Sequence, residues 1–353
     1  MNILYGLSGE GFGHSSRART VIPYLEEKGH EVKVMTYGKG VKALREDFDV
    51  FEIEGPEMLF EGGKLKRRKT IKKTAKNFIS NLKSSREIHQ FMKENDFDLC
   101  ISDMSLLVPI LANKVWYNKP LISLDNQHRL THLEFEVPKK HKKDFLAAKE
   151  VTRAFVRRAD WFIITSFGKS KIKEKYEDRT IVVPPIIRPK VKSLSPKEEN
   201  KILVYSTKKN DKLLDTLKQI DQKFVVYGWD KEDEDENLIF HKTGDGFLED
   251  LRKARAVIGS SGYTLISESL FLKKPYFALP LKGQFEQVLN SLFLEDSNLG
   301  DYSEDVDRDK IEEFLGEIDR YGEELKKYNP NYDKIFEALD RVLRDVEENG
   351  KTR

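Results

Sequence analysis

Short apolar runs that alternate with helical patterns constrain the fold of this 353-residue chain more than any other feature. Parallel sheets with helices on both faces produce this alternation, because each strand is buried on both sides. The expected strands are 2–8, 31–37, 99–102, 121–124 and 161–165, followed by 202–206, 224–228, 256–260 and 276–279. The sequence therefore predicts an α/β protein built on doubly wound sheets.

The alternation of strands and helices stops once and then restarts. Pro184 and Pro185 end the first series, and the polar, proline-rich residues 186–200 are typical of a linker. We therefore expect two Rossmann-like doubly wound domains, residues 1–185 and 201–330, facing each other across a cleft. Such sheets bind ligands at the carboxyl ends of their strands.

The charge and cysteine content exclude several classes of protein. Charged residues make up 35% of the chain, but the net charge is only +2, so a dedicated nucleic-acid binder is not expected. A single cysteine, Cys100, leaves no disulfide framework and no cysteine metal site, and it fits the reducing cytoplasm. No apolar run approaches the ~18 residues of a membrane-spanning helix, and the N-terminus lacks the pattern of a signal peptide. We expect a cytoplasmic protein.

A glycine-rich turn, GEGFGH at residues 9–14, follows the first expected strand. A dinucleotide-binding fingerprint needs G-x-G-x-x-G and an acidic residue about 20 positions later. Gly9, Gly11 and Gly13 miss the last glycine of that pattern, and the second strand ends without a carboxylate, so NAD binding is not expected. The turn predicts a loop whose N–H groups face an anionic group, with His14 at its edge. An ordinary strand-to-helix turn is the alternative.

A second candidate binding segment covers residues 243–290. The turn 259–262 (GSSG) follows a strand and opens a helix, an arrangement that suits a diphosphate. Glu268 follows in the same helix, in a position suited to hydroxyl groups. Phe247 and Leu248 precede another helix.

This second segment closely resembles the donor-binding half of two-domain GT-B nucleotide-sugar glycosyltransferases, the family of the peptidoglycan lipid-II N-acetylglucosaminyltransferase and related UDP-glycosyltransferases. The strings 247–251 (FLEDL), 261–268 (SGYTLISE) and 286–290 (EQVLN) carry the resemblance. In the family the first string packs the uracil, the second takes the diphosphate and then the ribose, and the third contacts the sugar. The chain departs from the pattern at Glu286, where the family has glutamine, and at Ser260, where it has arginine.

The resemblance implies a role for individual residues of the second half. These are Phe247 and Leu248 for the base, Ser261, Gly262, Tyr263 and Thr264 for the diphosphate, Glu268 for the ribose, and Gln287 and Asn290 for the sugar. Ser206 and Thr207, after the first strand of the second half, are expected to add phosphate contacts.

The N-terminal turn resembles the Gly-Gly-x-Gly-Gly-His string of the same family, so Gly11 and Gly13 are expected to line a binding loop for the acceptor. The resemblance also implies a C-terminal helix, within 331–353, that packs back on the N-terminal acceptor-binding domain. The implied activity is inverting transfer of a sugar, an N-acetylhexosamine, from a UDP-sugar to a lipid-linked acceptor. No cofactor and no metal ion are expected, and the acidic run 230–236 is interpreted as a solvated loop.

The transfer needs a base to take the acceptor proton. Imidazole titrates near neutral pH, which favours His14, and such a base contributes about 10²–10⁴-fold. Glu10 would orient His14 or act as the base itself. Asp103 and His128 each follow an expected strand, so they are predicted to bind the acceptor, to act as an alternative base, or only to hold their loops.

Residues 64–76 carry eight lysine and arginine side chains and no acidic residue. Apolar residues continue at helical spacing at positions 71, 75, 78, 79 and 82. A basic amphipathic helix suits an anionic membrane surface, so peripheral membrane contact through 64–82 is expected. The alternative is a solvated helix face. Nucleic acid is disfavoured as a partner because no aromatic residues interleave the charges.

Two other functions remain open from the sequence. A UDP-sugar 2-epimerase would use the same fold and change the donor without an acceptor. A non-catalytic nucleotide or glycan binder would bind UDP and turn nothing over.

Overall fold

The computed structural model describes residues 1–56, 60–61, 64–65, 72–74, 76–77, 80–81, 85–156, 158–168, 170–244 and 246–349. The chain forms two compact units. Unit 1 comprises Met1–Ser166, Ser170–Arg188 and Tyr332–Arg353, and unit 2 comprises Phe167–Lys169 and Pro189–Asn331. Much of the basic segment 64–82, including all five of its apolar positions, lies outside the described residues, and so does the helix predicted from them.

Unit 1 is built on a parallel sheet in which the strand order is β3-β2-β1-β6-β7-β9-β11. The strands are β1 (Asn2–Leu7), β2 (Glu31–Thr36), β3 (Val50–Glu52), β6 (Leu99–Asp103), β7 (Leu121–Asp125), β9 (Trp161–Thr165) and β11 (Thr180–Val183). The chain moves outward from β1 in one direction, then returns to β6 and moves outward in the other. The order of the strands therefore reverses between β1 and β6, which is the point where doubly wound sheets bind ligands.

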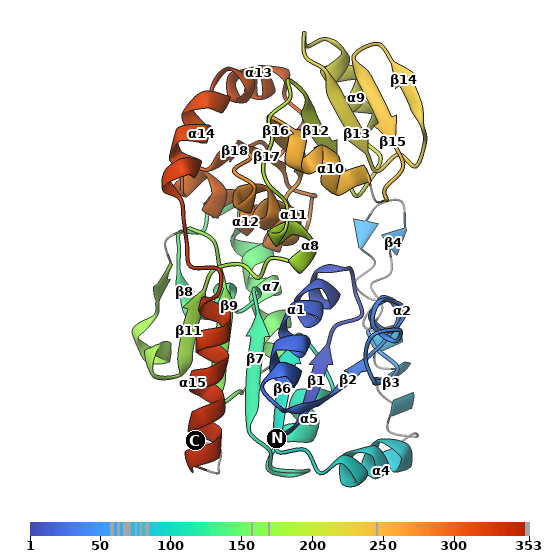
Figure 1. Cartoon of the computed structure of the whole chain (residues 1–353), viewed down its shortest axis with the longest axis vertical. Helices are drawn as coiled ribbons and strands as arrows, with labels where there is room; N and C mark the ends of the chain where they lie inside the picture. Colours follow the sequence, from blue (N-terminus) through green and yellow to red (C-terminus); the bar gives the residue numbers. More distant parts are fainter. Residues whose placement is uncertain are drawn as a thin grey trace. The chain divides into compact units, whose positions relative to one another are not determined.

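Helices pack around this sheet (Figure 1), and unit 1 also contains two short two-stranded pairs. The helices are α1 (Gly13–Glu27), α2 (Lys39–Leu44), α4 (Ser85–Asn95), α5 (Val108–Ala112), α6 (Arg129–His132), α7 (Lys142–Phe155) and α15 (Lys334–Asn349), with 3-10 turns at Lys139–His141 and Glu174–Arg179. The two-stranded pairs are β4 (Phe60–Glu61) with β5 (Lys64–Leu65), and β8 (Leu133–Glu134) with β10 (Lys171–Ile172).

The last helix, α15, belongs to the core of unit 1 (Figure 1). Ile335, Leu339 and Val342 are buried in the same apolar cluster as the residues of β1 and α1. The ring of Phe336 stacks on Tyr24 of α1, with 4.3 Å between centroids. The last segment of the chain therefore completes the fold of the first unit.

Helix α1 begins directly after the glycine-rich turn. Its N-cap residue is Phe12, which makes no side-chain capping hydrogen bond, and Ser15 lies buried inside the first turn. The helix ends before Gly29, whose φ of +84° is typical of the residue that follows a helix.

Unit 2 repeats the doubly wound arrangement with the order β14-β15-β13-β12-β16-β17-β18. The strands are β12 (Ile202–Tyr205), β13 (Phe224–Tyr227), β14 (Asp233–Asp235), β15 (Leu238–His241), β16 (Ala256–Ser260), β17 (Tyr276–Leu279) and β18 (Gly300–Tyr302). All pairs are parallel except β14 with β15, and the strand order reverses between β12 and β16.

The helices of unit 2 are α8 (Pro189–Lys192), α9 (Asp211–Lys218), α10 (Gly246–Lys253), α11 (Tyr263–Phe271), α12 (Phe285–Asp296), α13 (Arg308–Gly316) and α14 (Ile318–Lys327). Within the segment 186–200, α8 and the following residues pack with unit 2: the Lys197 N–H donates to the Arg252 carbonyl at 2.9 Å. The acidic run 230–236 is not wholly a loop, because Asp233–Asp235 form the antiparallel edge strand β14.

Candidate active site

The glycine-rich turn joins β1 to α1 at the carboxyl edge of the sheet of unit 1. A Cβ on Gly9 would overlap the backbone carbonyl of Tyr37, so the close approach of the two segments requires glycine. Gly11 has a φ of +78°, in the left-handed region that side chains disfavour. The Glu10 N–H donates to Ser8 Oγ at 3.3 Å, which closes the turn. These contacts lead the chain into α1, which starts at Gly13 and carries His14 as its second residue.

His14, on α1, is held by a hydrogen bond to a buried carboxylate at the end of β6. Its Nδ1 lies 2.7 Å from Oδ1 of Asp103, the last residue of β6. Arg17, one turn further along α1, donates from Nε to Oδ2 of Asp103 at 2.8 Å and from Nη2 to Oδ1 at 2.6 Å. The Asp103 side chain has no exposed surface, whereas 13% of the His14 side chain is exposed. His14 is therefore the member of the cluster that a substrate can reach.

The charge state of Asp103 fixes which nitrogen of His14 carries a proton. Burial alone raises the pKa of the Asp103 carboxyl, but the Arg17 guanidinium and His14 outweigh that effect and hold this pKa below its ordinary value. A carboxylate 2.7 Å from Nδ1 requires a proton between them. We therefore assign the proton of neutral His14 to Nδ1, which leaves the lone pair on Nε2.

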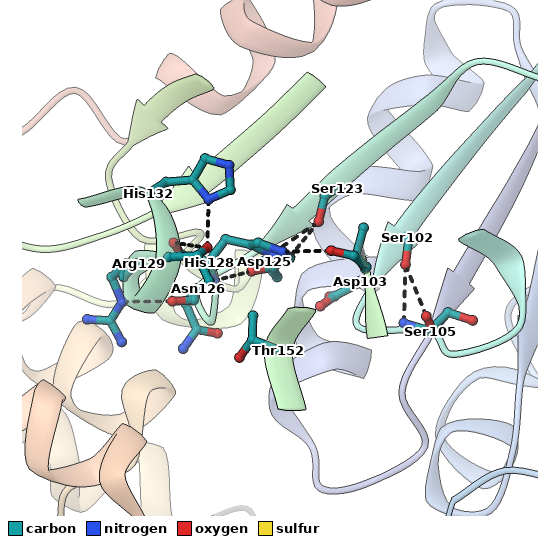
Figure 2. A network of polar contacts seen from close by, with 12 residues as sticks. Ser102, Asp103, Ser105, Ser123, Asp125, Asn126, His128, Arg129, His132 and Thr152 are labelled. Carbon is teal, nitrogen blue, oxygen red and sulfur yellow. Dashed lines mark hydrogen bonds and ion pairs between the residues drawn. The ribbon is translucent and has the colours of Figure 1, made fainter. Parts of the chain in front are cut away.

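His128 belongs to a second His–Asp pair, and this one is enclosed (Figure 2). Its Nδ1 lies 2.7 Å from Oδ2 of Asp125, and its Nε2 lies 3.3 Å from the Val156 carbonyl. The Ser123 hydroxyl donates to the same Asp125 oxygen at 2.7 Å. Because both side chains of the pair are at most 2% exposed, the geometry favours a role in bracing the edge of the sheet.

Unit 2 carries a corresponding pair of loops between β12 and β16. The Thr207 N–H, just after β12, donates to Oγ of Ser260 at 3.3 Å, and the Thr207 hydroxyl lies 3.3 Å from the same atom. The Ser206 hydroxyl donates to the Lys208 carbonyl at 2.6 Å. Ser260 is the last residue of β16, so the predicted turn 259–262 starts inside the strand.

Helix α11 follows this turn and has no side-chain cap. Its N-cap residue Gly262 has an extended backbone (φ −72°, ψ 130°) that any residue adopts, and a Cβ there would lie 4.0 Å from its nearest neighbour, the Ser260 carbonyl. The N–H groups of the first turn, from Tyr263 through Thr264, have no acceptor within the helix. Such a helix N-terminus attracts an anion. Glu268 lies further along the same helix and is buried.

Phe247 and Leu248 lie half-buried on α10. The Phe247 ring makes edge-on contacts with Tyr227, at 5.0 Å between centroids, and with Tyr205, at 5.6 Å. The Tyr227 hydroxyl donates to Asp250 Oδ2 at 2.6 Å, which joins β13 to α10. The half-exposed Phe247 ring is therefore held in place by the rings of Tyr227 and Tyr205.

Gln287 and Asn290 lie on α12, and their side chains bind loops of unit 2. Oε1 of Gln287 accepts from the Leu281 N–H at 2.9 Å, and its Nε2 donates to Gln284 Oε1 at 2.9 Å. Asn290 donates to the Ser261 carbonyl at 2.8 Å and is buried. Asn290 therefore reaches the turn before α11, and Gln287 reaches the loop after β17.

The structure thus brings the sequence-predicted residues together as two groups. In unit 1, His14 and Asp103 meet, while His128 pairs with Asp125. In unit 2, the residues around β12, β16 and α11 share one edge. No group of three or more potential metal-ligating His, Cys, Asp or Glu side chains occurs among the described residues. Within the same residues, no helix combines the length and apolar character needed to cross a bilayer.

Arg17 and Asn126 are functional candidates that the sequence interpretation missed. Nη1 of Arg17 donates to Oδ1 of Asn126, just after β7, at 3.1 Å, so Arg17 joins three elements of the site. Asn126 in turn accepts from Arg129 Nε through its backbone carbonyl at 2.9 Å (Figure 2). The sequence contains an indication of this role, because helical spacing places Arg17 on the same face as His14 and the buried Val21.

Two doubly wound units with polar loops at both strand-order reversals define a two-domain α/β ligand-binding protein. The chain matches the family model of Glycosyl transferase family 1 over residues 1–319, and it belongs to that family. Its fold is the two-domain GT-B fold, as the sequence predicted, and the predicted resemblance to glycosyltransferases is confirmed.

Several solved glycosyltransferases share this fold. MurG from Acinetobacter baumannii is 14% identical, with 96% of this chain and 99% of that chain covered and a TM-score of 0.60. The calicheamicin glycosyltransferase CalG4 is 14% identical over 98% of each chain, with a TM-score of 0.64. UGT2 from Phytolacca americana, solved with UDP-2fluoro-glucose and pterostilbene, is 12% identical over 96% of this chain and 98% of that chain, with a TM-score of 0.67. No curated protein matches the sequence.

Proposed function

We propose that this glycosyltransferase transfers a sugar, an N-acetylhexosamine, from a UDP-sugar to a lipid-linked acceptor with inversion at the anomeric carbon. Unit 2 binds the donor, and unit 1 supplies the base and the acceptor site. No metal ion or other cofactor takes part. The enzyme works in the cytoplasm, at the inner face of the membrane.

The uncapped N-terminus of α11 carries the proposal for the donor. Ser261 and Gly262 form the turn at the strand-order reversal of unit 2, where the Gly262 N–H donates to the Ser260 carbonyl at 2.7 Å. Tyr263 and Thr264 open α11 there, and the N–H groups of this first turn are proposed to bind the diphosphate. Negative charge develops on the diphosphate as the glycosidic bond breaks, and these N–H groups stabilise it where it forms. In this proposal Phe247 packs against the uracil base and Glu268 binds the ribose. Gln287 and Asn290 lie on the side of the site that binds the sugar.

The bound ligand of one relative supports a UDP-sugar as donor. The Phytolacca americana UGT2 structure contains UDP-2fluoro-glucose. The lipid-linked acceptor and the membrane contact through 64–82 rest on the sequence resemblance and on the basic composition of that segment.

His14 is the base of the proposed reaction. Its Nε2 takes the proton of the acceptor hydroxyl as the acceptor oxygen forms a bond to the anomeric carbon. The bond between that carbon and the diphosphate oxygen breaks, and UDP leaves with the electron pair. Asp103 orients the ring and stabilises the imidazolium that forms, because its carboxylate lies 2.7 Å from Nδ1. Because the acceptor oxygen attacks the anomeric carbon from the face opposite the leaving group, the configuration of that carbon is inverted.

Calorimetric binding of UDP, UDP-GlcNAc, UDP-glucose, GDP-mannose and NAD to the purified protein tests the donor site. We expect selective binding of the uridine nucleotides, weakened by Glu268→Ala and unchanged by Glu313→Ala, an exposed position on α13. Binding without uridine preference, or insensitive to Glu268→Ala, would contradict the proposed donor.

Transfer of radiolabel from UDP-GlcNAc to vesicles that contain a polyprenyl-diphosphate-linked sugar, which offers a sugar hydroxyl as acceptor, tests the reaction. His14→Ala should lower transfer by about 10²–10⁴-fold without weakening UDP binding, whereas His89→Ala, an exposed position on α4, should not. Conversion of the UDP-sugar to its epimer without an acceptor would indicate a 2-epimerase. UDP binding without any turnover would indicate a non-catalytic binder.

A further inference from the structure

Unit 1 contains two His–Asp pairs with the same 2.7 Å distance between Nδ1 and carboxylate oxygen, but their carboxylates have different partners. Asp125 accepts from the Ser123 hydroxyl and the His128 backbone N–H, which are neutral groups. Asp103 accepts two hydrogen bonds from one edge of the Arg17 guanidinium, through Nε and Nη2, and Arg17 is itself buried. Of the two histidines, only the partly exposed His14 is therefore paired with a carboxylate, that of Asp103, that also binds a cation, Arg17.

We infer that Arg17 is a positioning residue that acts through Asp103 to keep the His14 ring neutral, with its proton on Nδ1 and its lone pair on Nε2. This inference rests on the proposed role of His14 as base. A base must be unprotonated when the acceptor arrives, so a device that favours the neutral ring serves the reaction.

The hydrogen bonds fix the Asp103 carboxylate in one orientation. Nε of Arg17 holds Oδ2 at 2.8 Å and Nη2 holds Oδ1 at 2.6 Å, a planar two-point contact that leaves Oδ1 facing Nδ1 of His14. The third guanidinium nitrogen is held by Asn126 at 3.1 Å. The position of the carboxylate therefore does not depend on His14.

The charge balance of the cluster disfavours a second proton on the ring. Nη2 of Arg17 lies 3.0 Å from Nδ1 of His14, and once Nδ1 carries a proton both nitrogens are donors to the same oxygen. With His14 neutral, the charges of Arg17 and Asp103 cancel. With His14 protonated, the cluster carries a net positive charge next to a buried guanidinium.

The other titratable groups around this cluster do not replace Arg17. Tyr5 of β1 is buried beside it, and burial followed by the charge of Asp103 raises the pKa of its phenol well above the ordinary value, so it stays neutral. Asp125 of β7 acts on Arg17 at longer range. Glu10 lies in the turn before α1. Arg17 is thus the cation that offsets Asp103.

Nuclear magnetic resonance of the full chain labelled with ¹⁵N,¹³C-histidine tests the inference directly. The chain has seven histidines, and His14→Gln assigns the signal. In Arg17→Met the pH at which the ring takes up its second proton should rise by about 1–3 units, because the carboxylate is no longer offset. Arg17→Lys keeps the charge, so the midpoint should stay near that of the unaltered protein.

A double variant guards against loss of folding. Arg17→Met leaves a buried carboxylate without its cation, which destabilises the fold. Arg17→Met combined with Asp103→Asn removes both charges. The His14 titration midpoint of this double variant should lie below that of Arg17→Met alone. If Arg17→Met does not fold, the midpoint of the double variant should match that of the unaltered protein within about one pH unit. A midpoint that does not move in Arg17→Met, or a double variant whose midpoint lies more than about one unit above the unaltered protein, would overturn the inference.

The pH dependence of sugar transfer separates this inference from the proposed function. If both hold, the acidic limb of the rate profile in Arg17→Met moves to higher pH by the same amount as the midpoint, and activity recovers as the pH rises. If His14→Ala keeps full activity while the magnetic resonance shift is seen, His14 is not the base, but Arg17 still sets its protonation.

Discussion

The side-chain amide of Asn290, on α12, donates to the backbone carbonyl of Ser261 at 2.8 Å. The hydroxyl groups of Ser261 and Ser291, the residue after Asn290, lie 2.9 Å apart. Together these bonds attach α12 to the turn that precedes α11. The shape of the proposed diphosphate site therefore depends on a helix that follows it by some thirty residues in the chain.

Replacement of Asn290 tests this dependence. Asn290→Ala leaves the buried Ser261 carbonyl without its donor, so we expect a loss of about 1–3 kcal/mol in the free energy of unfolding and weaker UDP binding. Asn290→Asp should cost more, because a carboxylate oxygen then faces a carbonyl oxygen. Urea unfolding and calorimetry measure the two effects. Gln219→Ala, at the exposed end of α9, is the control and should change neither. If the Asn290→Ala protein folds and binds UDP with unchanged affinity, the donor site does not depend on α12.

The aromatic group at α10 gives a second prediction. Phe247 is half-exposed and rests on Tyr227 and Tyr205, so it is available to pack against a nucleobase. Phe247→Ala should weaken UDP binding by about 2–15-fold, the range that one aromatic contact contributes. Phe12→Ala removes a ring that is 69% exposed in the turn before α1, and it should leave UDP affinity unchanged. Equal UDP affinity in both variants would mean that the uracil base does not pack against Phe247.

Much of the fold could be predicted from the sequence because buried parallel strands are continuous apolar runs. The strands β16 and β17 begin and end where their apolar runs do, at 256–260 and 276–279. Strands such as β3 and β18, each three residues long, gave no such signal because they are short and only partly buried. The edge strand β14 consists of three carboxylic acids, so nothing in its composition distinguishes it from a loop.

The candidate site could be predicted only in part, because motifs identify residues and not their partners. The glycine turn indicated His14, and the strand end indicated Asp103. Their direct contact depends on parallel pairing of β1 with β6, which no local pattern encodes. Arg17 was missed because a single arginine among apolar positions of a helix is usually interpreted as a solvated side chain.

The turn before α1 predicts a sharp difference between two glycines. Gly9→Ala places a methyl group against the Tyr37 carbonyl, so it should lower the free energy of unfolding by about 1–3 kcal/mol. Gly316→Ala, at the end of α13, meets no atom within 4 Å and should be neutral or stabilising by about 0.4–1 kcal/mol. Urea unfolding of the two variants measures the contrast. Similar stability in both would mean that the turn moves away from Tyr37 at little cost.

We expect the acid stability of the fold to depend on His132, the last residue of α6. Its ring lies against Tyr176 and Phe162, at 3.9 and 4.2 Å between centroids, and Nδ1 lies 2.7 Å from the Thr131 hydroxyl. Burial first, and then the neighbouring His128, lower the pKa of His132 to about 3.

Because the pKa of His132 is lowered by folding, the unfolded chain binds the proton more readily, and stability is lost as the pH falls from about 6.5 towards 3. Between pH 7 and pH 5 this group should cost about 2 kcal/mol of unfolding free energy. His132→Phe keeps an aromatic ring in the same stack and should remove that part of the pH dependence, whereas His89→Phe, at an exposed position, should not. Urea unfolding at the two pH values gives the difference directly. If the loss of stability between pH 7 and pH 5 is the same with phenylalanine at position 132, the acid sensitivity arises from another group.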